Sequence, residues 1–329
     1  MLTEKENFMR MLRGEIPEFL PRYDMFGWCA MFSPFERKKN ADGYEVDEFG
    51  MEHTTNASSM GGMMPVPGRI LVRDITKWRD VIKTPDLSNL DWAQIAEKEM
   101  AKKDPVNNPV IVFAGDFFMK IMNFMSFSEG LCALQEEPEE VYALLDWLCE
   151  YYLKLLDKKI TYLKPDILSL ADDVAAAQQP FISVDMYRRL ILPHHKRLAD
   201  FALDRGLTLI MHCCGKCESF IDDWLDMGVS GWEPAQVSND LKGIKKKYGS
   251  RLAIMGGWDN TGPISYPDTP DDVLLAALKE YVDTFAPGGR FAYMAMVMSE
   301  NDDPDSVRKV KLSEDFYQNY ARLWYKNNA

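Results

Sequence analysis

The chain has 329 residues, of which 47% are hydrophobic and 12% aromatic, values typical of a globular protein with a sizeable core. Lysines and arginines number 38 against 51 aspartates and glutamates, and the resulting net charge of −13 disfavours binding to nucleic acid or to an anionic membrane surface. No apolar run reaches transmembrane length, and the first residues lack the apolar centre of a signal peptide. Since Cys29, Cys132 and Cys149 are scattered, we expect a cytoplasmic protein with reduced thiols.

Strand-like and helix-like segments alternate along most of the chain. Short apolar runs predict strands at residues 110–114, 166–171, 207–212, 229–233, 251–256 and 290–294, with a weaker first strand at 21–26. Amphipathic stretches predict helices at residues 138–163, 184–204, 216–227, 239–248 and 271–285. Roughly eight strand–helix units favour an α/β fold of the (β/α)₈ barrel type, a single domain over residues 1–329, rather than an open doubly wound sheet.

The first hundred residues are less regular than the rest. Residues 58–68 are rich in glycine and methionine, a composition that predicts a loop rather than a strand or helix. We therefore expect residues 1–65 to form an extension and lid over the barrel mouth.

In such a barrel, functional residues collect at the carboxyl ends of the strands. Asp172, Asp173 and Asp259 end strands there and are candidates for proton transfer, although loop acids or helix caps would look the same. Aromatic and methionine side chains at the same ends are candidates for an apolar substrate pocket, and His53 of the first segment could join them. This second set comprises Tyr23, Phe26, Trp28, Phe117, Trp258, Met294 and Met296. His194 and His195 are expected to face solvent or the barrel wall.

The densest cluster of reactive side chains is the stretch 212–217, His-Cys-Cys-Gly-Lys-Cys, at the end of the predicted fifth strand. Residues two apart on a strand point the same way, so His212 and Cys214 should project together. An imidazole and a thiolate at this place suit zinc. A thioredoxin-like redox role for Cys214-x-x-Cys217 is the alternative, and reversible disulfide formation would distinguish it.

The order and spacing of these motifs resemble the uroporphyrinogen decarboxylase superfamily, over most of the chain. The superfamily adopts a (β/α)₈ barrel and includes corrinoid-dependent methyltransferases. The segments that carry the resemblance are residues 5–14, 47–50, 171–173, 182–183, 187–193, 212–215, 228–234 and 256–259.

Within that superfamily, the resemblance is closer to the methylcobamide:coenzyme M methyltransferase branch. True uroporphyrinogen decarboxylases hold an octa-anionic substrate with an arginine-rich segment near the first strand, where this chain has Arg22 and no second arginine until Arg37. The methyltransferases hold zinc with His-x-Cys and a later cysteine, but no cysteine follows Cys217 here. Glu233 is the favoured third ligand and Cys217 the reserve, and loss of the metal is a third possibility.

The resemblance implies an enzyme that moves a methyl group between a small methylated substrate or thiol and a corrinoid. The corrinoid would be supplied by a partner protein, because the chain shows no corrinoid-binding domain. The alternative is a decarboxylase of a small acid or porphyrinogen-type substrate, with Asp172 or Asp173 steering protonation, and a non-enzymatic binding barrel comes third.

Overall fold

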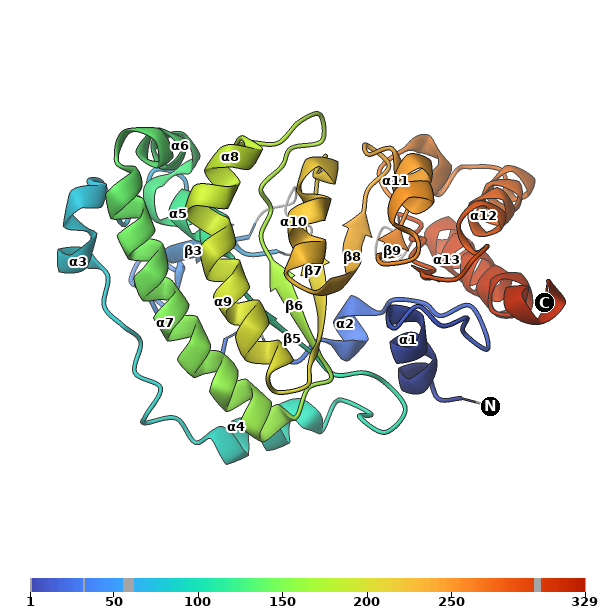
Figure 1. Cartoon of the computed structure of the whole chain (residues 1–329), viewed down its shortest axis with the longest axis horizontal. Coiled ribbons are helices and arrows are strands. Elements are labelled where there is room, and N and C mark those ends of the chain that lie inside the picture. Colours follow the sequence, from blue (N-terminus) through green and yellow to red (C-terminus); the bar gives the residue numbers. More distant parts are fainter. Residues whose placement is uncertain (1, 32, 56–61, 299–302, 329) are drawn as a thin grey trace.

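A computed structural model describes residues 2–31, 33–55, 62–298 and 303–328 (Figure 1). Its centre is a six-stranded sheet in which every pair of neighbours is parallel and the strands follow one another in chain order. The strands are β5 (Ile111–Ala114), β6 (Ile167–Ala171), β7 (Thr208–His212), β8 (Val229–Ala235), β9 (Ala253–Gly256) and β10 (Phe291–Ala292). Each lies within a predicted strand or overlaps one.

One segment near the N-terminus touches both edges of this sheet. Arg22 forms a parallel bridge with Tyr293 just after β10, and Cys29 forms one with Ile111 of β5. Between these bridges the chain forms the short helix α2 (Met25–Trp28), so the weak strand predicted at 21–26 is wrong beyond its first residues. Asp24 causes the change, because its carboxylate accepts the Gly27 N–H at 2.8 Å and starts a helix. Eight strands were predicted. In the described part of the chain, six strands and this bridging segment are found instead.

Alternation of side chains along the strands produces two cores, as expected of a barrel. The inner core collects alternate strand residues such as Ile111, Ile210 and Met255, together with Phe8 and Met11. The last two come from α1 (Glu4–Leu12), which packs against the inner residues. The outer core lies between the strands and the surrounding helices. The predicted α/β barrel class is thus confirmed.

Helices flank the sheet as the alternation predicted (Figure 1). Four predicted helices appear as α7 (Pro138–Leu163), α9 (Leu192–Leu203), α11 (Leu241–Tyr248) and α12 (Asp271–Phe285), and α10 (Ile221–Asp226) falls within a fifth. The stretch before α9 is also helical, through α8 (Val184–Met186) and a π-helical turn at Tyr187–Ile191. Helices that the sequence analysis did not predict are α1, α2, α3 (Trp78–Val81), α4 (Trp92–Met100), α5 (Phe117–Met125), α6 (Phe127–Glu136), α13 (Pro304–Phe316) and α14 (Trp324–Asn327).

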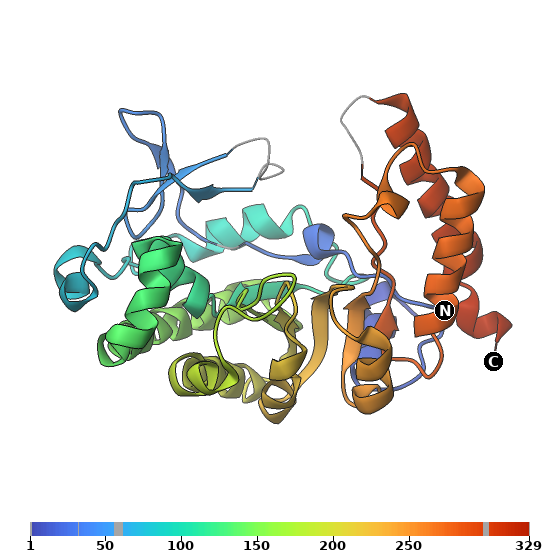
Figure 2. The ribbon, with the colours of Figure 1, turned by 90° about the horizontal axis from the view of Figure 1, so that it is seen from above.

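The N-terminal extension contains a second, antiparallel sheet that the sequence analysis did not predict. Its strands are β1 (Lys38–Lys39), β2 (Glu45–Val46), β3 (Glu52–Thr54) and β4 (Met64–Pro65). Figure 2 shows this sheet and α13 on the same side of the molecule, at opposite ends. Of the loop predicted at residues 58–68, residues 58–61 lie outside the described residues and residues 64–65 form β4 instead of a loop. A lid function of residues 1–65 stays a prediction. None of the described helices is long and apolar enough to cross a membrane.

Candidate metal centre

The candidate site lies where β6, β7 and β8 end inside the barrel. His212 is the last residue of β7 and pairs in register with Glu233 of β8. His212 follows Ile210 of the inner core by two residues, and Glu233 follows Gly231, whose missing Cβ would face the inner core, so both side chains point into the barrel. Glycine at position 231 allows close packing inside the barrel, because a Cβ would lie 2.8 Å from a methyl of Met255 and 2.9 Å from one of Leu12.

Glu233 fixes the orientation of the His212 ring. Both oxygens of its carboxylate lie 3.0 Å from His212 Nδ1, and the Glu233 side chain is fully buried. Ser169 of β6 donates a longer hydrogen bond of 3.5 Å to the same carboxylate. With Nδ1 facing Glu233, His212 presents Nε2 to the residues that follow β6 and β7.

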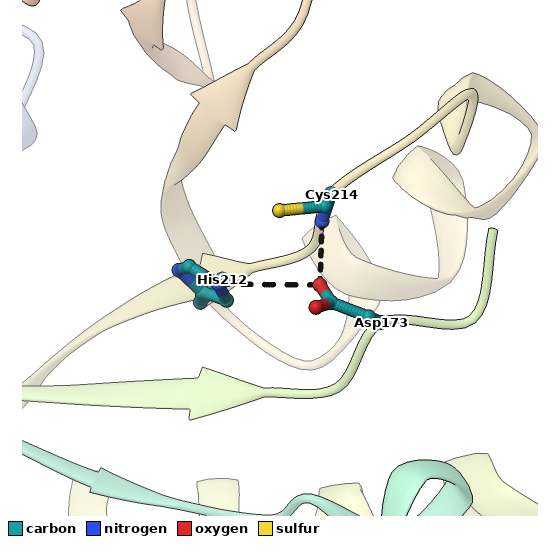
Figure 3. Close-up of side chains that lie close together, drawn as sticks. All are labelled: Asp173, His212 and Cys214. Atoms are coloured by element: carbon teal, nitrogen blue, oxygen red, sulfur yellow. Dashed lines mark hydrogen bonds and ion pairs between the residues drawn. The ribbon is translucent and has the colours of Figure 1, made fainter. Parts of the chain in front are cut away.

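The side chains of Asp173, His212 and Cys214 lie close together (Figure 3). One ligand atom each from Asp173, His212 and Cys214 lie within 4.8 Å of one another. The Cys214 N–H donates to Asp173 Oδ1 at 2.7 Å, and that oxygen lies 3.9 Å from His212 Nε2. All three residues are partly exposed, so a small molecule can reach the cluster.

Gly215 allows the two loops of the cluster to pack closely. It has a φ of +86°, and a Cβ there would lie 2.3 Å from the carbonyl oxygen of Ala175. The neighbouring Lys216 N–H donates to the carbonyl of Ala176 at 2.8 Å. The glycine after Cys214 therefore holds the loop of Asp173 beside the loop of Cys214.

Burial and neighbouring polar groups shift the pKa values of His212 and Cys214. Burial lowers the pKa of His212, but the charge of Glu233, hydrogen bonds to Cys214 and Glu233 and the charge of Asp173 outweigh it, leaving the pKa well above its usual value. Burial raises the pKa of Cys214, and the hydrogen bond with His212 opposes this only partly. A cation bound here would compete with both protons.

The donor set fits zinc. Zinc bonds of about 2.0–2.3 Å place neighbouring ligand atoms of a tetrahedron roughly 3.3–3.8 Å apart. The 3.9 Å between His212 Nε2 and Asp173 Oδ1 is close to that spacing, and since all three ligand atoms lie within 4.8 Å of one another, zinc binding would need shifts of no more than about 1.5 Å. Nitrogen, sulfur and oxygen donors together suit zinc better than magnesium or calcium.

The structure places the two other predicted ligands differently. Glu233 lies against Nδ1 of His212 and is not a member of the three-residue group. Cys217 is fully buried, with its Sγ 3.6 Å from the carbonyl oxygens of Cys213 and Gly215. Cys213 is equally buried, as expected of a small core residue.

The predicted acidic residues have three different environments. Asp172 is buried and accepts the Phe118 and Met119 N–H groups at 2.8 and 3.0 Å, which caps α5. Burial raises the pKa of Asp172 well above its usual range. Asp173 belongs to the cluster, a ligand position that the sequence analysis did not assign to it. Asp259 accepts the Gly262 N–H at 2.9 Å in the turn after β9.

Four of the predicted substrate residues come together. Tyr23, Phe26, Met294 and Met296 line one pocket of about 480 Å³ between the segment after Pro21 and the chain that leaves β10. Burial raises the pKa of the Tyr23 phenol well above its usual value, and the charge of Glu233 adds to that rise.

The other four predicted substrate residues are buried elsewhere. Trp28 packs edge-on against Phe8, and Trp258 donates a hydrogen bond to Ser265 Oγ at 2.8 Å. Phe117 packs in the outer core. His53 lies in β3 with its Nε2 2.9 Å from Asp47 Oδ2.

Comparisons with known proteins found one family and several solved structures. A family model for uroporphyrinogen decarboxylase (URO-D) matches residues 45–291. A methyltransferase structure from Methanosarcina mazei superposes with a TM-score of 0.60 at 15% identity, covering 96% of this chain and 100% of that one. A 3-keto-D-glucoside 4-epimerase from E. coli reaches a TM-score of 0.38 at 11% identity, covering 77% of this chain and 97% of that one. No curated protein matches the sequence significantly.

Proposed function

Because the chain belongs to the uroporphyrinogen decarboxylase (URO-D) family, we propose that it is an enzyme that moves a methyl group between a small methylated substrate or thiol and a corrinoid carried by a partner protein. The observation that carries this proposal is the convergence of Asp173, His212 and Cys214 at the barrel mouth. The similar fold of a protein named a methyltransferase supports the same activity.

In this proposal His212, Cys214 and Asp173 hold zinc, and Asp173 takes the place predicted for Glu233. Three protein ligands leave the fourth position open for a substrate atom, as catalytic zinc sites require. Zinc bound there would favour the thiolate of a thiol acceptor, or polarise the heteroatom of a methyl donor, at neutral pH.

The residues around the ligands have supporting roles. Glu233 accepts the Nδ1 proton of His212, which fixes the tautomer that leaves Nε2 free to bind a cation. The Cys214 N–H holds Asp173 Oδ1 at 2.7 Å, so one carboxylate oxygen is already oriented before any ligand arrives. The site is therefore largely preorganised by its neighbours.

The decarboxylase alternative is less well supported by the pocket. A carboxylated substrate needs cationic side chains to offset the cost of burying its charge. Of the described residues that line the pocket, Arg22 is the one cation, and its guanidinium lies 2.9 Å from Glu314. Methyl transfer is thus the function that we favour.

Two measurements test the proposal on the full chain. We expect one equivalent of zinc by elemental analysis of protein purified without chelator. We also expect methyl transfer from methylated ethers or thioethers to free cob(I)alamin, followed by its visible absorbance. Absence of metal would contradict the zinc site, while release of carbon dioxide from a carboxylated substrate without methyl transfer would favour the decarboxylase.

A further inference from the structure

The loop after β7 that carries Cys214 is hydrogen-bonded at every backbone N–H from Cys213 to Glu218. Each N–H donates to a group outside these residues, at distances of 2.7–3.1 Å. In chain order the acceptors are the Glu233 carbonyl, Asp173 Oδ1, Gln236 Oε1, the Ala176 carbonyl and, for the last two N–H groups, Asn239 Oδ1. Because satisfied N–H groups fix the path of a backbone, the chain around Cys214 leaves β7 in a defined direction (Figure 3).

Gly215, which directly follows Cys214, is bonded through both its N–H and its carbonyl. The N–H donates to Gln236 Oε1 at 2.7 Å, and the carbonyl accepts from Asn239 Nδ2 at 2.9 Å. Both amide side chains come from the turn between β8 and α11. Since this turn is short and lies between two regular elements, it holds the two amides in place beside the loop.

Asn239 is the more deeply buried of the two amides, with 6% of its surface exposed. Its Oδ1 accepts the N–H groups of Cys217 and Glu218 at 3.0 and 3.1 Å, at the start of the 3₁₀ turn Glu218–Phe220. The first N–H groups of a helix have no partner within it, and Cys217 supplies no side-chain cap. Asn239 therefore caps this turn from a different loop. Its Nδ2 also donates to the Gln236 carbonyl at 3.0 Å, which connects the two amides.

The acceptor of the Cys214 N–H differs from these amides, because Asp173 is itself a proposed ligand. A cation at the cluster competes with this N–H for Asp173 Oδ1, so the hydrogen bond of 2.7 Å weakens when a metal binds. The bonds from Gln236 and Asn239 to Gly215 involve no proposed ligand atom. They can therefore hold the loop equally well with and without a metal.

We propose that Gln236 and Asn239 are positioning residues, which hold Cys214 beside His212 and Asp173 so that its thiolate binds the metal without a rearrangement of the loop. Neither amide binds the metal itself. Residues of this kind act on metal affinity by orienting a ligand. The inference rests on the proposed function, because it takes a metal held by Asp173, His212 and Cys214 as its premise.

Two variants at Gln236, loaded with cobalt(II) in place of zinc, test the inference on the full chain. Gln236→Leu has a similar volume and no acceptor, whereas Gln236→Glu keeps an oxygen for the Gly215 N–H. We expect Gln236→Leu to bind cobalt(II) and zinc about tenfold more weakly, with a shifted or weaker thiolate-to-cobalt absorption band. Gln236→Glu should keep the wild-type band. The band decides the comparison, since the added charge of glutamate can strengthen metal binding by itself.

Gln135→Leu, a control at an exposed amide of α6, should change neither the metal affinity nor the band. Asn239→Asp tests the second amide, because it keeps an acceptor for Cys217 and Glu218 and loses the donor to Gly215. We expect it to weaken metal binding and to change the band as Gln236→Leu does. Denaturant unfolding with EDTA measures the stability of each metal-free variant. A lower stability with unchanged band and affinity in Gln236→Leu and Asn239→Asp would mean that the amides act on the fold alone, and would overturn the inference.

The same measurements separate the inference from the proposed function. If metal binding depends on Gln236 and Asn239 as expected but no methyl group reaches cob(I)alamin, the proposed function fails while the inference stands. If the wild type transfers methyl groups and the variants bind metal equally well, the proposed function stands and the inference fails. A wild-type chain without affinity for cobalt(II) or zinc would overturn both.

Discussion

Two histidines, one partly buried inside the barrel and one fully buried in the outer layer of helices, have opposite electrostatic environments. His212 lies between Glu233, 3.0 Å from Nδ1, and Asp173, 3.9 Å from Nε2, and its pKa is raised well above its usual value. His194 of α9 lies between the rings of Phe117 and Tyr142, and neither of its nitrogens has a hydrogen-bond partner in the described part of the chain. Burial lowers the pKa of His194 to about 4.

The difference shows what separates a candidate ligand from a packing residue. Both imidazoles are largely removed from water, and burial alone disfavours the charged form of each. The carboxylates around His212 reverse that effect and hold the ring in a fixed orientation. Aromatic neighbours give His194 only packing. A functional assignment therefore depends on what faces the ring nitrogens, not on burial.

The largest expected effect comes from removing two ligands at once. In His212→Ala with Cys214→Ser, only Asp173 of the proposed set remains, so we expect zinc content and methyl transfer to fall to near zero. One carboxylate does not retain zinc against solvent. Elemental analysis and the cob(I)alamin assay measure the two effects. His194→Phe is the matched control, and zinc retained in the double variant would remove His212 and Cys214 from the site.

The second prediction concerns acid stability and the outer histidine. His194 stays neutral in the folded protein down to about pH 4, whereas in the unfolded chain it takes up a proton below about pH 6.5. The unfolded state then binds more protons, so the free energy of unfolding should decrease as the pH falls from about 6.5 to about 4, by up to about 3 kcal/mol from this residue.

His194→Phe removes that contribution and keeps a ring between Phe117 and Tyr142. Denaturant unfolding at several pH values, in the presence of EDTA so that metal loss plays no part, should show a shallower decrease in the variant than in the wild type. Equal slopes for the two proteins would mean that His194 is already protonated or exposed in the folded state.

The regular part of this structure could be predicted from the sequence because the apolar pattern of each strand lies within a few consecutive residues. The strands β5, β6, β7 and β9 lie within their predicted segments and β8 overlaps its own, and the inward positions of His212 and Glu233 follow from a period of two. The edge segment 21–30 was less predictable. Only single bridges join it to the sheet, and the capping carboxylate of Asp24 turns it into a helix.

The third member of the cluster could not be read from the sequence for a related reason. Asp173 reaches Cys214 through a hydrogen bond between residues 41 apart, which depends on how two loops cross above β6 and β7. The only indication in the sequence was that Asp173 comes directly after the strand β6. Asp172 has the same kind of position, but it caps α5 instead. Loop packing around Gly215, not residue spacing, distinguishes the two aspartates.

The third prediction separates two roles for Glu233. In the first role Glu233 is not a ligand and only orients His212 through Nδ1. Glu233→Gln then keeps a hydrogen-bond acceptor near Nδ1 but loses the charge, and zinc affinity should fall about 10–100-fold. If Glu233 were itself a ligand, the loss should approach that of the double ligand variant. Competition with a chromophoric chelator measures the affinity. Glu218→Gln, at an acid that pairs with Lys216 outside the cluster, should leave it unchanged.

The smallest expected effect concerns the third cysteine of the stretch 212–217. The Cys217 thiol is fully buried and faces the carbonyls of Cys213 and Gly215, so it cannot reach an ion held by Cys214 and Asp173 without a change in the loop. We expect Cys217→Ala to keep a full equivalent of zinc and to lose about 1 kcal/mol of stability, from one small buried group and two weak hydrogen bonds. Cys214→Ala should instead lose the metal with little loss of stability. If Cys217→Ala lost zinc as completely as Cys214→Ala, the Cys214-x-x-Cys217 pair, and not Asp173, would complete the site.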